Sequence, residues 1–326
     1  MDILISRPFP GEGIGRLEQA GHRVRVLADD RPQSEFYAAL SQSDAAISLL
    51  SDPISAEHLR QCPRLRVLAN YAVGFNNIDI AAATAAGIAV SNTPHVLTDA
   101  TADVTMILIL DALRRVPEAL DSLRRGEFTG WKPIYLLGQD LAGKNLGILG
   151  MGRIGEAVAR RAEAFGMRIL YHTRSGAKPG LPWPAVSFEA LLAESDVLSL
   201  HCPLTAETTH LIGWNQLQRM KRTAVLINTS RGPVVDEAAL ARALREKVIF
   251  AAGLDVYERE PIVHPDLLNV PNAVLLPHIG SGTIETRSRM GTMAAECVLA
   301  VLAGQLPPYP VNPDVRNHPR WGKGTL

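Results

Sequence analysis

The sequence has few cysteines, no excess of either charge and no long hydrophobic run. Its 33 Lys and Arg residues balance 33 Asp and Glu residues, so no global field favours nucleic acid or an anionic membrane. An anionic ligand therefore needs local charge. The three cysteines, Cys62, Cys202 and Cys297, are odd in number and lack metal-ligand spacing. They predict neither a disulfide framework nor a metal site, and they suit a reducing compartment.

No apolar run approaches the roughly 18 residues of a membrane span. The first eight residues are too short and too acidic a segment to form a secretory signal. We therefore expect a soluble, cytoplasmic protein. With 326 residues, of which 47% are apolar, the chain can bury two cores of ordinary domain size.

Residues 145–155 have the pattern of a dinucleotide-binding loop, because three glycines lie between an apolar strand and a helix-like run. Gly150 allows the tight turn, Gly152 lets backbone N–H groups reach a pyrophosphate, and Gly155 lets the helix pack on the strand. The N-terminus of the helix adds partial positive charge for the anion.

A second glycine-rich segment, residues 11–15, is interpreted as structural. Its third glycine comes too early for a nucleotide loop, and Glu12 would place negative charge where a phosphate should lie.

The acidic residue expected about 20 residues after a dinucleotide loop, where it would bind the adenosine ribose, is missing. Thr173, Arg174 and Ser175 stand there instead. A carboxylate would repel a 2′-phosphate, whereas a guanidinium can bind one, with the two hydroxyls as further donors. The sequence therefore predicts NADP(H) over NAD(H), with NAD(H) still possible. The alternative is that Arg174 is a solvated loop cation.

Short β-branched or leucine-rich runs alternate with helical stretches along the chain, as in parallel sheets covered by helices. Because the glycine loop lies near the middle, a separate domain must precede it. The predicted fold class is α/β, with two doubly wound parallel-sheet domains, a Rossmann nucleotide domain being inserted in a flavodoxin-like substrate domain. The expected strands are 3–5, 24–27, 45–49, 67–69, 88–90, 147–149, 168–171, 197–200, 224–227, 250–254 and 273–276.

Two long apolar helices, residues 101–123 and 284–302, bracket the nucleotide part and are expected to cross between the domains. The predicted boundaries assign residues 1–99 and 286–326 to the substrate (catalytic) domain and residues 100–285 to the NADP-binding domain. This nesting predicts a cleft and a hinge at the junction, where ligand sites prefer to lie.

Three segments late in the chain each follow an expected strand and carry Arg231, Glu260 and His278. The carboxyl ends of strands line the ligand crevice of a doubly wound sheet, so these side chains can converge on one small substrate. Reduction of a 2-keto acid needs a cation to hold the carboxylate and polarise the ketone, and an acid to protonate the developing alkoxide. Arg231 suits the first role and His278 the second, while Glu260 can orient the imidazole and favour its protonated form.

Taken singly, each of these three residues has a simpler explanation. Arg231 could be a surface cation, Glu260 could cap a loop, and His278 could be a strand-end histidine whose hydrogen bonds are satisfied within the protein. No residue stands at a spacing that would make it a base for Cys202, so we expect Cys202 to line the cofactor and not to act as a nucleophile. We expect His201 to be a packing residue. Asp255 could accept a hydrogen bond from the nicotinamide amide, or it could cap a loop.

The glycine loop and the three late segments that carry Arg231, Glu260 and His278 together resemble the D-isomer-specific 2-hydroxyacid dehydrogenase family. The resemblance covers nearly the whole chain. It implies that Arg231, Glu260 and His278 are the catalytic residues and that the protein is a homodimer. Further segments are similar to the glyoxylate/hydroxypyruvate reductase branch, which typically prefers NADPH. They are residues 70–74, 92–94, 97–103 and 130–133.

The same resemblance implies the remaining site residues. The N–H groups of Val73 and Gly74 would bind the substrate carboxylate, Leu50 and Ser51 would flank it, and Trp131 would close the pocket of its own or the partner subunit. An anchor in the dimer segment is an equal alternative for Trp131. The expected cofactor contacts are Thr101, Gly150, Gly152, Arg153, Ile154, Gly155, Thr173, Arg174, Ser175, Cys202, Pro203, Thr229, Ser230, Asp255 and Gly280.

We therefore expect an enzyme that reduces small 2-keto acids, glyoxylate or hydroxypyruvate, to D-2-hydroxy acids with NADPH. Two alternatives stay open: a dimeric cofactor-sensing module resembling the corepressors related to this family, and an NAD-linked D-2-hydroxyacid dehydrogenase with another substrate. Formate dehydrogenase is a poor match because its relatives pair the histidine with Gln where this chain has Glu260. Phosphite dehydrogenase is also a poor match, because a resemblance to that enzyme requires a lysine where this chain has Val73.

Overall fold

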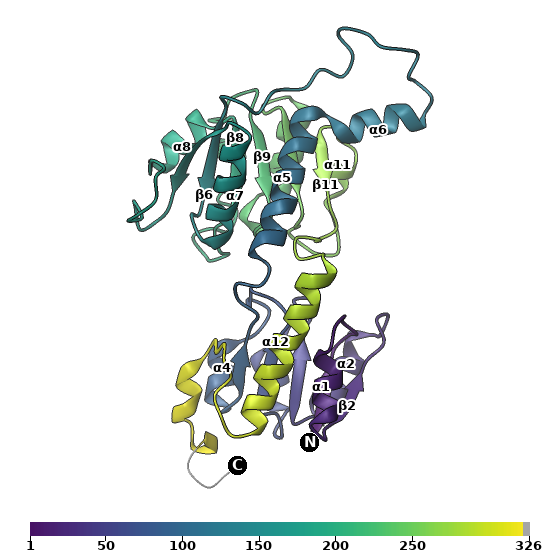
Figure 1. The fold of residues 1–326 in the computed structure, drawn as a ribbon, viewed down its shortest axis with the longest axis vertical. Helices are drawn as coiled ribbons and strands as arrows, with labels where there is room; N and C mark the ends of the chain where they lie inside the picture. The colour runs from purple at the N-terminus through teal and green to yellow at the C-terminus, as the bar shows by residue number, and fades with distance from the viewer. Residues whose placement is uncertain (322–326) are drawn as a thin grey trace. The chain divides into compact units, whose positions relative to one another are not determined.

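The computed structural model describes residues 1–321 and divides into two α/β units, each with its own sheet (Figure 1). The first unit comprises Met1–Leu97 and the C-terminal segment that starts at Gly282. The second unit is Thr98–Ser281. The expected boundaries lay at residues 99/100 and 285/286, and the assignment of substrate and nucleotide binding to the two units stays a prediction.

The first unit has a five-stranded parallel sheet in the order β2-β1-β3-β4-β5, which is the flavodoxin-like order. Its strands are β1 (Asp2–Ile5), β2 (Arg23–Val26), β3 (Ala45–Ser48), β4 (Val67–Asn70) and β5 (Ala89–Ser91). Its α-helices are α1 (Gly13–Gln19), α2 (Gln33–Leu40), α3 (Ala56–Arg60), α4 (Ile80–Ala85) and α12 (Ile284–Leu302), followed by the 3-10 turns η2 (Pro313–Asn317) and η3 (Pro319–Trp321).

The second unit has a parallel sheet in the order β11-β10-β9-β8-β6-β7. A parallel bridge between Tyr171 and Ala185 extends the sheet beyond β7, which completes the Rossmann strand order. The strands are β6 (Asn145–Leu149), β7 (Arg168–His172), β8 (Val197–Leu200), β9 (Val225–Asn228), β10 (Ala251–Leu254) and β11 (Ala273–Leu275). The helices are α5 (Thr98–Arg114), α6 (Val116–Arg124), α7 (Arg153–Ala164), α8 (Phe188–Glu194), α9 (Trp214–Leu217), η1 (Gly232–Val234), α10 (Glu237–Arg245) and α11 (Pro265–Leu268).

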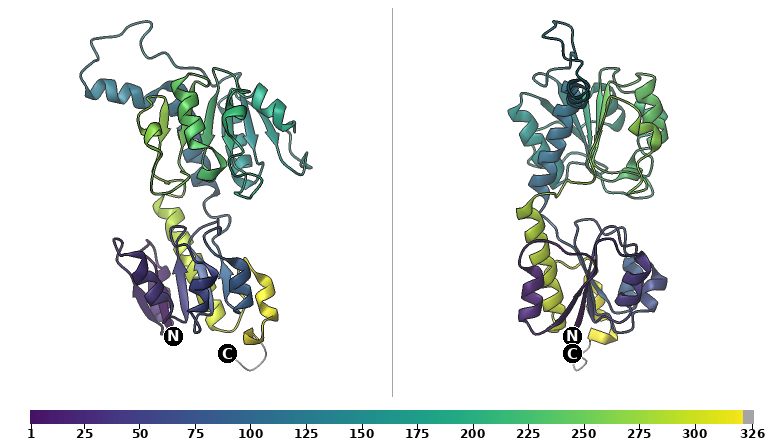
Figure 2. Two further views of the ribbon diagram at one scale, coloured as in Figure 1. Left: turned by 180° about the vertical axis from the view of Figure 1, so that it is seen from behind. Right: turned by 90° about the vertical axis from the view of Figure 1, so that its right-hand side faces the viewer.

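Each unit has three layers, with helices on both faces of its sheet (Figure 2, right). Side chains alternate along the strands, so each sheet builds two cores. In the second unit, Ile148 packs with α5 and α7 on one face, while Leu149 packs with α8 and α10 on the other. In the first unit, Leu4 faces α2 to α4, and Ile5 faces α1 and α12. The predicted fold class is therefore confirmed.

The eleven expected strands are all present, with ends displaced by at most two residues. The single helix expected over residues 101–123 is wrong: the chain forms α5 and α6, and Arg115 between them adopts a left-handed conformation (φ 56°). Pro117 supplies the reason, because proline has no N–H with which to continue the hydrogen bonds of α5 and is favoured in the first turn of a new helix. The break redirects the chain into α6 and a projecting coil, residues 125–140 (Figure 1).

The contacts of residues 11–15 support their structural interpretation. A Cβ at Gly13 would lie 2.5 Å from the carbonyl oxygen of Gly291, so glycine permits close packing of α1 on α12. Among residues 1–321, no helix is both long and apolar enough to cross a membrane.

Candidate active site

The glycine loop of the second unit turns sharply from β6 into α7. Gly150 has φ 96°, and a Cβ there would lie 2.6 Å from the Cys202 backbone nitrogen. A Cβ at Gly155 would lie 2.6 Å from the Gly150 carbonyl oxygen. A Cβ at Gly152 would meet nothing within 4 Å, so this side of the loop is open to a ligand. Gly152 also precedes α7 without a side-chain cap, which leaves the first N–H groups of the helix available to an anion.

A tight turn follows β7 at the position predicted to bind a 2′-phosphate. The Thr173 hydroxyl donates a hydrogen bond of 2.6 Å to the Gly176 carbonyl, and Gly176 N–H donates back to the Thr173 carbonyl. The Thr173 hydroxyl proton is therefore used within the turn, contrary to its expected role as a free donor. The side chains of Arg174 and Ser175 are exposed, but the Ser175 hydroxyl lies 3.3 Å from the Thr173 hydroxyl within the same turn, so Arg174 is the group left available for a phosphate.

A carboxylate that the sequence analysis missed lies near this turn. The hydrogen bond from Thr205 lowers the pKa of Glu207, and the charge of Arg174 lowers it further. Only the folded chain reveals this proximity, because more than thirty residues separate Glu207 from Arg174 along the sequence.

The structure brings Glu260 and His278 into direct contact. Nδ1 of His278 lies 2.8 Å from Oε2 of Glu260, and each side chain is about one-third exposed (34% and 36%). The other carboxylate oxygen accepts a hydrogen bond from the Tyr257 N–H. Burial alone would raise the pKa of Glu260, but the hydrogen bond and charge of His278, the Tyr257 N–H and the charge of Arg231 together hold that pKa below its usual value.

Arg231 follows β9 and belongs to the same electrostatic cluster. Burial lowers the pKa of its guanidinium, while the charge of Glu260 acts in the opposite direction. The Asn228 amide donates to the Arg231 carbonyl and so fixes the backbone of this loop. A Cβ at Gly232 would lie 1.8 Å from the Tyr257 carbonyl carbon, so the loop with Arg231 packs directly on the loop with Glu260.

Asp255 holds the backbone of the segment that carries His278. Its two carboxylate oxygens each accept a hydrogen bond of 2.7 Å, one from Ile279 N–H and one from Gly280 N–H. This contact matches the loop-cap alternative, and a contact with the nicotinamide amide stays a prediction. The Thr101 hydroxyl donates to the Gly280 carbonyl, which joins the start of α5 to this segment.

Cys202 and His201 lie next to the glycine loop and are not built for acid-base or nucleophilic work. Burial raises the pKa of the Cys202 thiol to about 11, so the thiol stays protonated near neutral pH. Burial also lowers the pKa of His201 to about 4, and its Nε2 hydrogen-bonds the Ser199 hydroxyl. All three cysteines are free thiols. Residues 1–321 contain no cluster of His, Cys, Asp or Glu suited to a metal ion.

The residues expected to bind the substrate carboxylate lie in the first unit. Leu50 and Ser51 follow β3, and Val73 and Gly74 follow β4, the neighbouring strand of the sheet. All four are at least partly exposed. The ends of two adjacent parallel strands thus present these residues at one edge of the sheet.

Trp131 stands apart from the other predicted site residues of its unit. Its side chain is 85% exposed and belongs to the projecting coil, residues 125–140. A ring this exposed covers no pocket within its own unit. Whether it closes the pocket of the partner subunit or anchors a dimer segment stays a prediction.

Comparisons with known proteins point to one family. The model of the D-isomer-specific 2-hydroxyacid dehydrogenase NAD-binding domain matches residues 106–280. A glyoxylate reductase of Korarchaeum cryptofilum is 49% identical over 320 residues, with 96% of each chain covered, and one of Aeropyrum pernix is 52% identical over 293 residues, with 87% of each covered.

Solved structures agree with this assignment. A protein of Thermus thermophilus superimposes with a TM-score of 0.91 at 46% identity, covering 95% of this chain and 100% of its own. An NADPH-dependent glyoxylate/hydroxypyruvate reductase of Sinorhizobium meliloti, in complex with NADP and malonate, superimposes with a TM-score of 0.85 at 34% identity and covers 96% and 97%. The chain therefore belongs to the D-isomer-specific 2-hydroxyacid dehydrogenase family.

Proposed function

We propose that this chain reduces small 2-keto acids, glyoxylate or hydroxypyruvate, to D-2-hydroxy acids with NADPH. The observation that carries the proposal is the His278–Glu260 contact with Arg231 beside it, in the unit that also contains the open glycine loop. The names of the glyoxylate reductase relatives support the substrate class.

The chain's own residues fit a nicotinamide dinucleotide. The open face of Gly152 and the uncapped start of α7 suit a pyrophosphate. Thr101 and Gly280, which are joined by a hydrogen bond, are the residues proposed to line the nicotinamide. When bound, the reduced nicotinamide supplies the hydride. The protein's part is then to orient the keto acid and to provide the proton.

The proton comes from His278. Because Nδ1 faces Glu260, the other ring nitrogen, Nε2, is the one that can deliver a proton to the developing alkoxide. The Glu260 carboxylate holds the imidazole in place and stabilises its charged form. Arg231 binds the carboxylate and polarises the ketone through its planar guanidinium. The N–H groups of Val73 and Gly74 bind the substrate carboxylate.

An assay of NADPH oxidation with glyoxylate, hydroxypyruvate and larger 2-keto acids tests the activity. We expect turnover that is fastest with the small acids. Cofactor binding without turnover of any keto acid would support the sensing module instead. Turnover with NADH and a larger acid alone would support the NAD-linked alternative.

The preference for NADP(H) is proposed to depend on Arg174. We expect Arg174→Ala to lower kcat/KM for NADPH about tenfold or more and to leave that for NADH nearly unchanged. Thr173→Asp should shift preference toward NADH, because a carboxylate repels the 2′-phosphate. Arg168→Ala, which removes an exposed arginine from the opposite end of β7, is the matched control. Unchanged cofactor ratios in Arg174→Ala and Thr173→Asp would reject the phosphate site.

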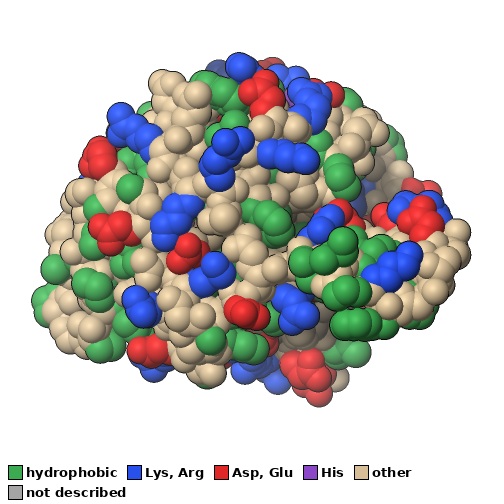
Figure 3. Space-filling view, turned by 90° about the horizontal axis from the view of Figure 1, so that it is seen from above, with side chains coloured by type: hydrophobic (Ala, Val, Ile, Leu, Met, Phe, Trp, Pro, Cys, Tyr) green, Lys and Arg blue, Asp and Glu red, His purple; other side chains and the backbone are tan. Residues whose placement is uncertain are grey.

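We also propose that two chains associate through the projecting coil. The side chains of Leu123, Phe128, Trp131, Ile134 and Leu137 are all more than half exposed. In Figure 3, hydrophobic side chains gather on the right, the side on which this segment projects in Figure 1. A monomer rarely exposes so large an apolar group, so a second copy of the chain is the proposed cover.

A further inference from the structure

Two successive N–H groups in the first unit lack a protein acceptor. Val73 and Gly74 follow β4, and within residues 1–321 neither N–H donates a hydrogen bond to the protein. Both residues are partly exposed. A pair of neighbouring, unpaired N–H groups is suited to one carboxylate.

The carbonyls of the same two peptides explain why these N–H groups face the same way. The Ala72 carbonyl accepts from Thr93 N–H (2.8 Å), and the Val73 carbonyl accepts from Nδ2 of Asn92 (2.7 Å). Both peptides are trans, so each N–H points away from its own carbonyl. Residues 92 and 93 hold both carbonyls on one side of the loop. The Val73 and Gly74 N–H groups therefore point to the opposite side of the loop.

Asn70 holds the third carbonyl of this loop. It is fully buried at the end of β4, and its Nδ2 donates to the Gly74 carbonyl (2.8 Å) and to Oδ1 of Asn77 (3.1 Å). Its own Oδ1 accepts from the Ser48 hydroxyl. Three successive carbonyls, 72 to 74, are thus held by the protein, which leaves the backbone of this loop little freedom to rotate.

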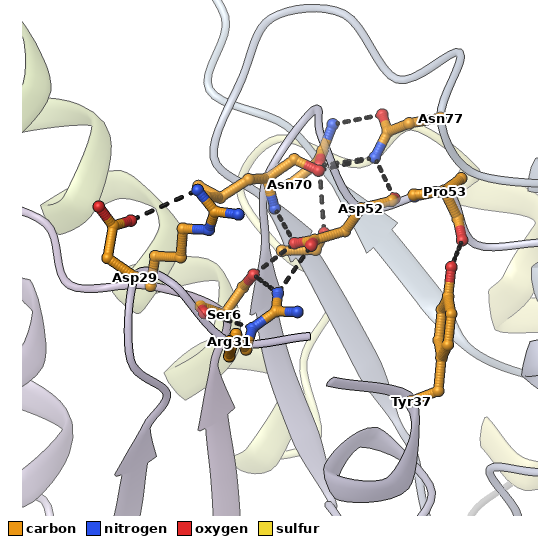
Figure 4. A network of polar contacts seen from close by, with 11 residues as sticks. Ser6, Asp29, Arg31, Tyr37, Asp52, Pro53, Asn70 and Asn77 are labelled. Carbon is orange, nitrogen blue, oxygen red and sulfur yellow. Dashed lines mark hydrogen bonds and ion pairs between the residues drawn. The ribbon is translucent and has the colours of Figure 1, made fainter. Parts of the chain in front are cut away.

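Asn77 joins this loop to the turn after β3. Its Nδ2 donates to the Leu49 and Asp52 carbonyls, both at 3.0 Å (Figure 4). The buried Asp52 carboxylate accepts from Leu49 N–H and forms an ion pair with the buried guanidinium of Arg31 (2.8 Å). The two loops that carry the four proposed substrate residues are therefore connected by one network of hydrogen bonds and one buried ion pair.

We propose that Asn92 and Asn70 are positioning residues for the substrate carboxylate: their side-chain amides orient the Val73 and Gly74 peptides so that both N–H groups donate to one carboxylate. This inference rests on the proposed function, because it takes a 2-keto acid as the ligand. Both side-chain amides donate to carbonyls of the loop, so the expected effect of the two asparagines is on binding geometry and not on the proton or hydride.

The test compares Asn92→Ala and Asn92→Asp with Asn312→Ala. Asn92→Asp keeps the shape but removes the donor. Asn312 is the matched control: it is a buried asparagine of the same unit that bonds Val90 N–H and the Ile88 carbonyl. We expect both Asn92 variants to raise KM for glyoxylate about tenfold or more, with kcat within about threefold of wild type and unchanged affinity for NADPH. Asn312→Ala should lower Tm without changing KM.

Asn70→Ser provides a second variant, for which the same rise in KM is expected. Unchanged KM in the Asn92 variants, or an equal rise in Asn312→Ala, would overturn the positioning role. If wild type reduced no keto acid, the proposed function would fail by itself. Calorimetric binding of oxalate in the presence of NADPH would then still decide the role of Asn92, since loss of oxalate affinity supports the inference and retained affinity rejects it.

Discussion

Nδ1 of His278 lies 2.8 Å from Oε2 of Glu260, although 18 residues separate them along the chain. The second oxygen of the carboxylate is held by Tyr257 N–H, so the carboxylate is fixed at both ends. Asp255 fixes the backbone beyond His278 through two further N–H groups. The imidazole is thus oriented by its own hydrogen bond and by the backbone that carries it, and Nε2 is left for chemistry.

Glu260→Gln is expected to lower kcat for glyoxylate about 10- to 100-fold and to change KM little. The glutamine oxygen can still accept from Nδ1, so the substitution removes the negative charge that stabilises the imidazolium while it keeps the ring orientation. Steady-state kinetics with saturating NADPH measure the effect. Wild-type kcat in this variant would show that the Glu260 charge has no part in proton delivery.

The lowered pKa of Glu260 predicts a pH-dependent contribution to stability. A carboxyl whose pKa is depressed in the folded state stabilises that state above its unfolded pKa, and the stabilisation is lost as the pH falls through the lower folded value. The difference in Tm between wild type and Glu260→Gln should therefore be present at neutral pH and shrink as the pH falls below about 4.5, the ordinary value. Thermal unfolding from pH 7 to pH 3 measures it; a difference that grows toward acid pH would contradict the assignment.

The sequence predicts the strands well because most of them are short apolar runs that alternate with helical stretches. The same feature places Arg231, Glu260 and His278 after strands, where a parallel sheet gathers them. The sequence pattern does not predict the contacts between loops. The bonds of Asn92 and Asn77 to backbone carbonyls depend on tertiary positions that no local spacing encodes.

Other misses have local causes that pattern analysis overlooked. The helix break at Arg115 was signalled by Pro117, but the apolar period on both sides concealed it. The Thr173 hydroxyl was assigned to a phosphate because of its position, whereas hydroxyls after strands commonly bond the backbone of their own turn. Periodicity therefore predicts elements more reliably than it predicts the partners of polar side chains.

Arg231→Lys should lower kcat/KM for glyoxylate about 100-fold or more although the charge is retained. Lysine cannot reproduce the planar, bidentate geometry that holds a carboxylate and a ketone together. Its Tm should stay close to that of wild type, since the loop backbone is fixed by Asn228 and by the packing of Gly232 on Tyr257. Near wild-type turnover would show that Arg231 is not the group that holds the substrate.

Substitution of the loop glycines should separate folding from cofactor binding. Gly152→Ala adds a methyl group to open space, so Tm should change little, while KM for NADPH should rise about tenfold because the pyrophosphate must approach that backbone. Gly155→Ala places a Cβ against the Gly150 carbonyl and should lower Tm by several degrees. Equal effects of both substitutions on Tm and KM would show that Gly152 is structural too.

The assembly proposal predicts that charge in the projecting coil separates the subunits. Trp131 and Ile134 are 85% and 83% exposed, and burying them against a second chain would remove a large apolar area from water. The double variant Trp131→Asp/Ile134→Asp should therefore elute with the mass of one chain, 35.3 kDa, by size-exclusion chromatography with light scattering. Leu268→Asp, which charges an exposed leucine of α11 outside this coil, should keep the wild-type mass. A wild-type protein of 35.3 kDa, or a double variant that remains a dimer, would rule out this segment as the interface.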